Sequence, residues 1–200
     1  MITILTAALL VAAQTGTSDD ITSTYTRIFD ADCTGLEVPG GLDISCPGYA
    51  DWRLTVAVGE HGQAIQYVHP SRGQSGFLGT PSRGLWGGYN NVMEWRLDGE
   101  QAFATIHRYR YDTPSDVARD TVYAERAEVL AVTALNAQTA CVIAYLDALS
   151  LENANVWARR VADTYARSWD CGEGEPMDLN AASTVELARI AADHEALGTD

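Results

Sequence analysis

Residues 92–111 read VMEWRLDGEQAFATIHRYRY, two runs of alternating apolar and polar residues on either side of an Asp-Gly pair. Asp-Gly between such runs is a strong signal for a β-hairpin, so this stretch predicts two antiparallel strands joined by a two-residue turn at Asp98 and Gly99. In that register one face is apolar and is expected to form core; it carries Met93, Trp95, Leu97, Ala102, Ala104 and Ile106. The hairpin therefore predicts an antiparallel sheet at the centre of the fold.

The opposite face of this hairpin is mixed and is predicted to be partly exposed; it carries Val92, Glu94, Arg96, Phe103, Thr105 and His107. On that face His107 and Glu94 would lie opposite each other, close enough to act as a general-base pair. An ordinary cross-strand polar contact explains the same two residues and is the favoured interpretation.

Outside the hairpin, alternating runs predict strands at residues 25–33, 44–49, 53–58 and 63–68, and a second hairpin at 128–135 and 139–146. Two helices follow: residues 151–168 after the N-cap Ser150, and a polar helix at 181–197 after Asn180. These elements predict an α+β fold, with a meandering antiparallel β-sheet, one helix packed on a face and a C-terminal polar helix.

Residues 1–13 are mostly apolar and end in Val11-Ala12-Ala13. A membrane span needs about 20 residues, so the pattern predicts a signal peptide cleaved after Ala13 and no membrane insertion. No Arg or Lys precedes the apolar run, so a mis-started N-terminus is the alternative. The expected organisation is a signal peptide at 1–13, a linker at 14–24, one α+β domain at 25–175 and a helical tail at 176–200.

Four cysteines, Cys33, Cys46, Cys141 and Cys171, are expected to form two disulfides in an exported chain, with three possible connectivities. Cys33 and Cys46 bracket a turn-rich loop, which favours a bond between them. A strand from Cys141 climbs about 23 Å, and the following helix returns about 28 Å, so Cys171 would arrive level with Cys141. C-x-x-C and Cys/His metal spacings are absent from the sequence, so a metal site is not indicated.

The composition excludes several classes of function. The chain has thirteen arginines, no lysine and 27 acidic residues, which give a formal net charge of −14. Without lysine there is no Schiff-base or P-loop lysine chemistry. The strong negative charge argues against binding to nucleic acid or to an anionic membrane surface.

A glycine-rich segment at residues 69–91 contains the tetrapeptide PSRG twice. It offers two arginines that can form bidentate bonds with a carboxylate or phosphate, and three aromatic residues that can pack on a ligand. These candidate ligand-binding residues are Arg72, Arg83, Phe77, Trp86 and Tyr89. The favoured alternative is a flexible connector that arose by local duplication.

Five short stretches carry a resemblance to a known family: CPGY (46–49), EWRL (94–97), IHR (106–108), CVIAYLDA (141–148) and NANVWAR (153–159). With their spaced cysteines they resemble an uncharacterised family of small exported bacterial proteins, defined as a domain of unknown function. The resemblance spans about residues 25–171. It implies an exported, disulfide-bonded domain and contributes no activity.

Candidate catalytic residues are few, since none of the four histidines lies in a metal-binding motif and every cysteine has an expected partner. The sequence therefore favours a periplasmic or secreted, non-catalytic binding or accessory module without a cofactor. Its partner would be an unknown protein or a small anionic ligand. The alternative is a hydrolase-like enzyme that uses His107 or His69 with a carboxylate.

Overall fold

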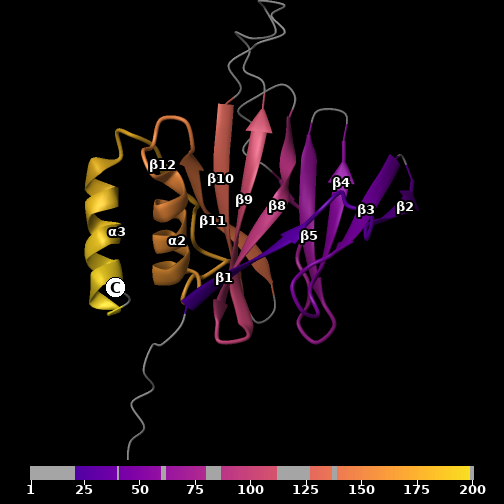
Figure 1. Ribbon diagram of the computed structural model, residues 1–200, viewed down its shortest axis with the longest axis horizontal. Coiled ribbons are helices and arrows are strands. Elements are labelled where there is room, and N and C mark those ends of the chain that lie inside the picture. The colour runs from indigo at the N-terminus through magenta and orange to yellow at the C-terminus, as the bar shows by residue number, and fades with distance from the viewer. Residues whose placement is uncertain are drawn as a thin grey trace, which may run out of the picture.

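The computed structural model describes residues 21–39, 41–59, 62–79, 87–111, 127–136 and 139–198 as two β-sheets and two helices (Figure 1). Sheet A contains, in spatial order, β1 (Ile21–Arg27), β8 (Gly87–Asp98), β9 (Gln101–Tyr111), β10 (Ala127–Leu135), β11 (Ala140–Asp147) and β12 (Met177–Leu179). Sheet B contains β2 (Thr34–Val38), β3 (Gly41–Pro47), β4 (Arg53–Val58), β5 (Gln63–His69) and β6 (Gly73–Gln74), with β7 (Leu78–Gly79) also paired to β5. The helices are α2 (Ala154–Tyr165) and α3 (Thr184–Ala196).

The predicted α+β fold is wrong, because the described chain is mainly β and its strands form two sheets. The cause lies in β4 and β5, whose alternation buries Leu54, Val56, Ile65 and Tyr67 on one face. A sheet with one apolar face must cover it. The helices already cover one face of sheet A, so sheet B packs against the other. Figure 1 shows the helices, sheet A and sheet B side by side in that order.

Sheet A is therefore buried on both faces, with one apolar cluster on each side. The cluster on the helix side includes Ile106 of β9 and Val161 of α2. The cluster on the sheet B side joins Trp95 of β8 to Leu54 of β4. A buried hydrogen bond crosses the same interface, where the Tyr67 hydroxyl lies 2.7 Å from Oγ1 of Thr105. Burial raises the pKa of Tyr67 to about 12, so this hydroxyl stays protonated.

The predicted β8–β9 hairpin is confirmed, with its turn shifted by one residue. Asp98 pairs with Gln101, which leaves Gly99 and Glu100 as the two turn residues. Gly99 has a φ of 58°, in the left-handed region that glycine adopts without steric cost.

The predicted face assignment within this hairpin is only partly correct. The pairing shifts register between Arg96 and Leu97, so that Ala104 lies opposite Arg96 and Ile106 lies opposite Glu94. Paired residues of an antiparallel sheet point to the same side. Ala104 and Ile106 therefore face the helices, away from the Trp95 cluster.

Two residues of the mixed face that was predicted to be partly exposed, Glu94 and Arg96, are buried under α2, whereas Thr105 and His107 face sheet B. Glu94 and Arg96 are 8% and 7% exposed. Arg96 donates from Nε and Nη2 to the two carboxylate oxygens of Asp163 in α2, at 2.8 and 2.7 Å. Arg159 of the same helix donates from Nε and Nη2 to the Glu94 carboxylate at 2.7 and 3.1 Å. Two ion pairs therefore join the helix to the sheet, and each buried charge has a partner, as burial requires.

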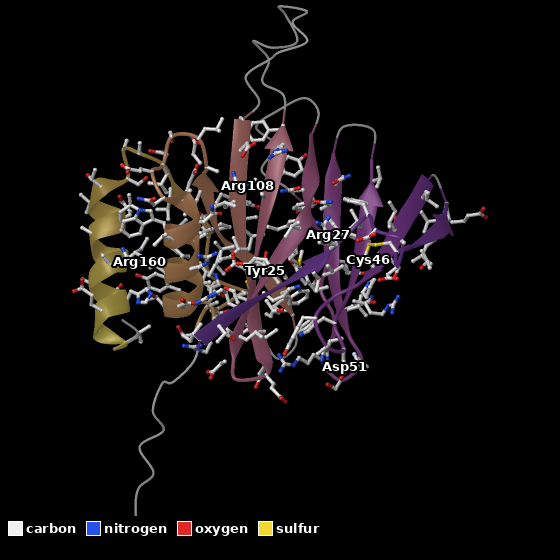
Figure 2. All side chains as sticks on the ribbon, viewed as in Figure 1. Tyr25, Arg27, Cys46, Asp51, Arg108 and Arg160 are labelled. Atoms are coloured by element: carbon white, nitrogen blue, oxygen red, sulfur yellow. A yellow bond between two sulfur atoms is a disulfide. The ribbon has the colours of Figure 1, made fainter. Side chains whose placement is uncertain are left out.

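Both predicted disulfides are present. Cys33 bonds to Cys46, which is fully buried in the core and visible in Figure 2. Cys141 bonds to Cys171 with 5.6 Å between their Cα atoms, so the antiparallel strand-and-helix argument is confirmed. The second bond ties the chain just beyond α2 to the start of β11.

The two ends of the described chain belong to the fold more fully than the sequence suggested. β1 begins at Ile21, inside the segment expected as a linker. In the expected polar tail, β12 pairs in parallel with β11, and Leu179 and Ile190 are 1% and 0% exposed. No helix in the described part of the chain has the length and apolar character needed to cross a membrane.

Candidate functional site

Of the five candidate residues of segment 69–91, the three that the structure describes are not brought together. Arg83 and Trp86 lie outside the described residues. Part of the segment forms β6 and β7, which return along β5. Phe77, just before β7, is 47% exposed. Tyr89, in β8, is half-buried against a cluster that contains Tyr109 and Val129. Arg72 lies apart from both, in the turn between β5 and β6.

Tyr89 has a structural role. Its ring stacks on that of His107, with 4.4 Å between ring centres and 7° between the planes. Its backbone N–H donates to Oε1 of Gln63 at 2.7 Å. Burial, followed by the neighbouring tyrosines, raises the pKa of Tyr89 well above its usual value. The half-buried Tyr89 ring is thus already in contact with the protein's own side chains.

His107 does not form the hypothesised pair with Glu94, because the two residues lie on opposite faces of sheet A. His107 pairs with Met93 on the face toward sheet B, whereas Glu94 faces α2. The His107 Nε2 atom lies 2.7 Å from the carbonyl oxygen of Asn90, to which it must donate, and Nδ1 has no partner among the described residues. Burial lowers the pKa of His107 to about 4, so the ring is neutral at physiological pH.

Arg72 is the candidate residue that reaches a cavity. The turn that carries it is closed by its own N–H, which donates to the His69 carbonyl at 3.2 Å. Its guanidinium carbon lies 5.7 Å from the centre of the Trp52 ring. Arg72 forms no ion pair with any acidic side chain in the described ranges. The cation is therefore held in place by an aromatic ring and left without a counter-ion there.

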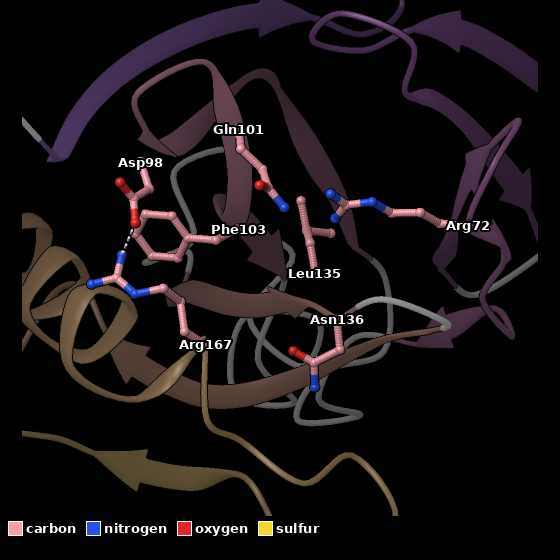
Figure 3. A pocket seen from close by; sticks show the side chains of 7 residues that line it. All are labelled: Arg72, Asp98, Gln101, Phe103, Leu135, Asn136 and Arg167. Carbon is pink, nitrogen blue, oxygen red and sulfur yellow. Dashed lines mark ion pairs between the residues drawn. The ribbon is translucent and has the colours of Figure 1, made fainter. Parts of the chain in front are cut away.

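Three adjoining cavities share Arg72 as a lining residue, at the end of the sheets where the β8–β9 turn lies. We call this end the turn end. The two larger cavities have volumes of about 370 and 430 Å³, and a narrow one of about 10 Å³ lies beneath. Volumes of this size are typical of small-molecule sites. The first cavity is lined by Arg72, Asp98, Gln101, Phe103, Leu135, Asn136 and Arg167 (Figure 3).

A second arginine, Arg167, lines the 370 Å³ cavity from the end of α2. Its guanidinium carbon lies 4.4 Å from the centre of the Phe103 ring. Its Nη1 atom lies 3.6 Å from Oδ2 of Asp98, and the two side chains are 38% and 61% exposed. This is a loose ion pair in water, which contributes little to stability.

No sequence signal pointed to Arg167, Gln101 or Asn136 as residues that line this cavity. Gln101, Asn136 and Arg167 come from a hairpin, the end of β10 and the end of a helix. Each is an ordinary polar residue at the end of an element, and only the packing of α2 across sheet A brings them together.

His69 lines the 430 Å³ cavity together with three acidic residues, Asp51, Asp98 and Glu100. Its Nδ1 atom lies 3.1 Å from the Ser71 hydroxyl, and its ring packs 4.7 Å from the Trp52 ring. Figure 2 shows Asp51 at the turn end. No hydrogen bond or ion pair joins His69 to an acid in the described part of the chain.

A metal centre has no support in the described residues, where no three His, Cys, Asp or Glu side chains are grouped to hold an ion. The cysteines are all in disulfides. The arrangement at the turn end instead offers cationic and amide donors around a cavity with an apolar wall, which suits non-covalent binding of an anion.

Comparison of this chain with protein-family models, with curated proteins and with solved structures gives no match. The resemblance to a family of exported bacterial domains of unknown function therefore stays a prediction.

Proposed function

We propose that this protein is a periplasmic or secreted, non-catalytic binding module that holds a small anionic ligand at Arg72. The observation that carries the proposal is the Arg72 guanidinium, packed against Trp52 without an acidic partner among the described residues, at the wall shared by three cavities. Arginine is the side chain best suited to bidentate recognition of carboxylate and phosphate. A partly buried guanidinium without a protein partner is well placed to receive one from a ligand.

Export is supported by the two disulfides, which persist in oxidising compartments and are rare in the cytosol. The apolar residues 1–13 support the same location as an expected signal peptide.

The hydrolase-like alternative has one observation in its favour, that His69 shares a cavity with three acidic residues. A general base needs a carboxylate to orient it and a nucleophile within hydrogen-bond reach. The Ser71 hydroxyl is within that reach, 3.1 Å from Nδ1 of His69, but no carboxylate bonds to His69 among the described residues. Binding is therefore the better-supported function.

Native mass spectrometry of the exported protein tests the proposal. We expect the wild type to retain anions from a mixture of small carboxylates and phosphates, and Arg72→Gln to retain few or none. Arg160→Gln is the matched control, because Arg160 also packs on an aromatic ring, that of Trp157 at 5.0 Å, but does not line these cavities. Equal anion retention by wild type and Arg72→Gln would refute the proposed site. Conversion of an added ester or amide that depends on His69 would support the hydrolase instead.

A further inference from the structure

We infer that the 370 Å³ cavity binds a linear dicarboxylate, with one carboxylate at Arg72, the other at Arg167, and an apolar chain between them. This inference rests on the proposed function and specifies its ligand. It requires two cationic ends, an apolar middle and an internal counter-ion that the ligand can displace.

The two cationic ends are built alike. Arg72 packs on Trp52 and Arg167 packs on Phe103, with 5.7 and 4.4 Å between guanidinium carbon and ring centre. A guanidinium that lies over a ring uses its flat face and keeps the N–H groups at its edge available. Figure 3 shows Arg72 reaching in from the right and Arg167 from below, with the Arg167 guanidinium directed toward Asp98 on the left. Each can therefore bind one carboxylate through two parallel hydrogen bonds.

The middle of the cavity has an apolar wall, with the Gln101 side chain beside it. Phe103 and Leu135, which are 6% and 3% exposed, lie between the two arginines in Figure 3. A methylene chain that packs on this wall is removed from water, which favours binding by about 0.8 kcal/mol per buried CH₂. A compact anion such as phosphate can satisfy one guanidinium but gains nothing from this wall. The geometry favours an elongated ligand.

Asp98 already occupies the position of one ligand carboxylate. Its Oδ2 atom lies 3.6 Å from Nη1 of Arg167, too far for a hydrogen bond, and both groups are well exposed to water. The seven lining residues include two arginines and one acid, so the cavity lining has one more cationic group than anionic. A dicarboxylate that displaces Asp98 gives each arginine a partner.

The surrounding negative charge means that ligand affinity must come from direct contacts with the two arginines. Asp51 and Glu100 line the adjoining 430 Å³ cavity, and the whole chain has a net charge of −14. The long-range field therefore repels anions, and binding depends on direct contact with the guanidiniums. Lysine keeps the charge but lacks the fork of N–H donors, so Arg72→Lys is expected to lose most of the affinity.

Calorimetric titration of the full disulfide-bonded chain tests the inference. The probes are α,ω-dicarboxylates of increasing chain length, the monocarboxylate of each length and inorganic phosphate. We expect one dicarboxylate length to bind at least about tenfold more tightly than its monocarboxylate, because a second charge-assisted contact forms. Arg72→Gln and Arg167→Gln should each remove that advantage, and Arg160→Gln should retain it. Asp98→Asn should increase dicarboxylate affinity about threefold, since the competing carboxylate is gone.

The outcomes separate the inference from the proposed function. Equal affinity for mono- and dicarboxylates that depends on Arg72 alone would overturn the two-ended ligand and leave the anion site in place. Phosphate binding more tightly than every dicarboxylate would have the same meaning. If none of the probes binds through Arg72, both proposals fail. The Asp98→Asn variant keeps this test decisive even if the arginine variants fold poorly, because Asp98 is exposed and only loosely paired. If Asp98→Asn binds the dicarboxylate less tightly than the wild type, the displacement step is wrong.

Discussion

His107 shows at the scale of one residue how this fold treats a titratable group. The ring is 2% exposed, is stacked on Tyr89 and donates one hydrogen bond to a backbone carbonyl. Its remaining nitrogen has no partner among the described residues. The cost of charging this ring in the core, rather than any neighbouring charge, lowers its pKa from 6.5 to about 4. The stability of the folded protein therefore depends on pH through His107.

We predict that His107 makes the protein less stable in mild acid. Between pH 6.5 and pH 4 the unfolded chain binds a proton at His107 and the folded chain does not, so the stability present above pH 6.5 is lost as the pH falls. The free energy of unfolding should be about 2 kcal/mol lower at pH 5 than at pH 7 from this group alone. Urea unfolding at pH 7, 6 and 5 measures the effect. His107→Phe, which keeps a stacked ring without a titrating nitrogen, should lack it, and an unchanged pH dependence in that variant would contradict the prediction.

The Arg96–Asp163 and Arg159–Glu94 pairs explain why α2 lies where it does. A helix with one apolar face could rotate on a sheet. Here, rotation of α2 would separate Arg96 from Asp163, and leaving either buried charge unpaired would cost stability. The pairs therefore set the position of α2, and through it the position of Arg167 at the cavity. A charged network that looks purely structural thus helps to shape the candidate site.

At the scale of elements, the C-terminal segment behaves as part of the core. The α3 helix has a polar composition that suggested a tail, yet Ile190 is fully buried in the cluster that also contains Val161 of α2. The hydroxyl of Tyr165 in α2 donates to Asp193 of α3, and Arg189 packs over the same ring. One inward-facing residue per few turns is enough to anchor a helix when the rest of its surface is polar.

We predict that Ile190→Ala lowers the free energy of unfolding by about 2–5 kcal/mol, because it leaves a cavity in a closely packed cluster. Val185→Ala on the same helix is the control; Val185 is 76% exposed, and a change below about 0.5 kcal/mol is expected. Chemical denaturation monitored by tryptophan fluorescence measures both. If the two substitutions have equal effects, α3 is a loosely attached tail.

At the scale of the whole molecule, the two disulfides join distant elements into one unit. The Cys141–Cys171 bond closes a loop of 30 residues and the Cys33–Cys46 bond one of 13. On the chain-entropy model these loops contribute about 4 and about 3 kcal/mol by restricting the unfolded chain. The longer loop also holds the end of α2, and so Arg167, against sheet A.

We predict that the protein recovered from outside the cytoplasm lacks residues 1–13 and has lost four hydrogens to two disulfides. Intact-mass analysis before and after reduction measures both changes. Replacing the Cys141 and Cys171 pair by alanine should lower the free energy of unfolding by about 4 kcal/mol, more than replacing Cys33 and Cys46. Four thiols that react with an alkylating reagent in the unreduced protein would contradict the predicted location.

The local features of this protein were predictable from its amino-acid sequence. The Asp-Gly turn predicted the β8–β9 hairpin, and alternation placed β4 at the residues where the structure has it. Element lengths alone were enough to pair Cys141 with Cys171. These inferences succeed because turn chemistry, side-chain alternation and the rise per residue depend on neighbours along the chain.

The tertiary structure alone decided the architecture and the candidate site. Alternation shows that a strand has an apolar face but not which surface covers it, so sheet B was mistaken for a continuation of sheet A. One bulge reversed the facing of Ala104 and Ile106, because side chains alternate with a period of two and one extra residue inverts them. Arg72 was found from the sequence and Arg167 was not, since their cavity forms only where α2 crosses the end of sheet A.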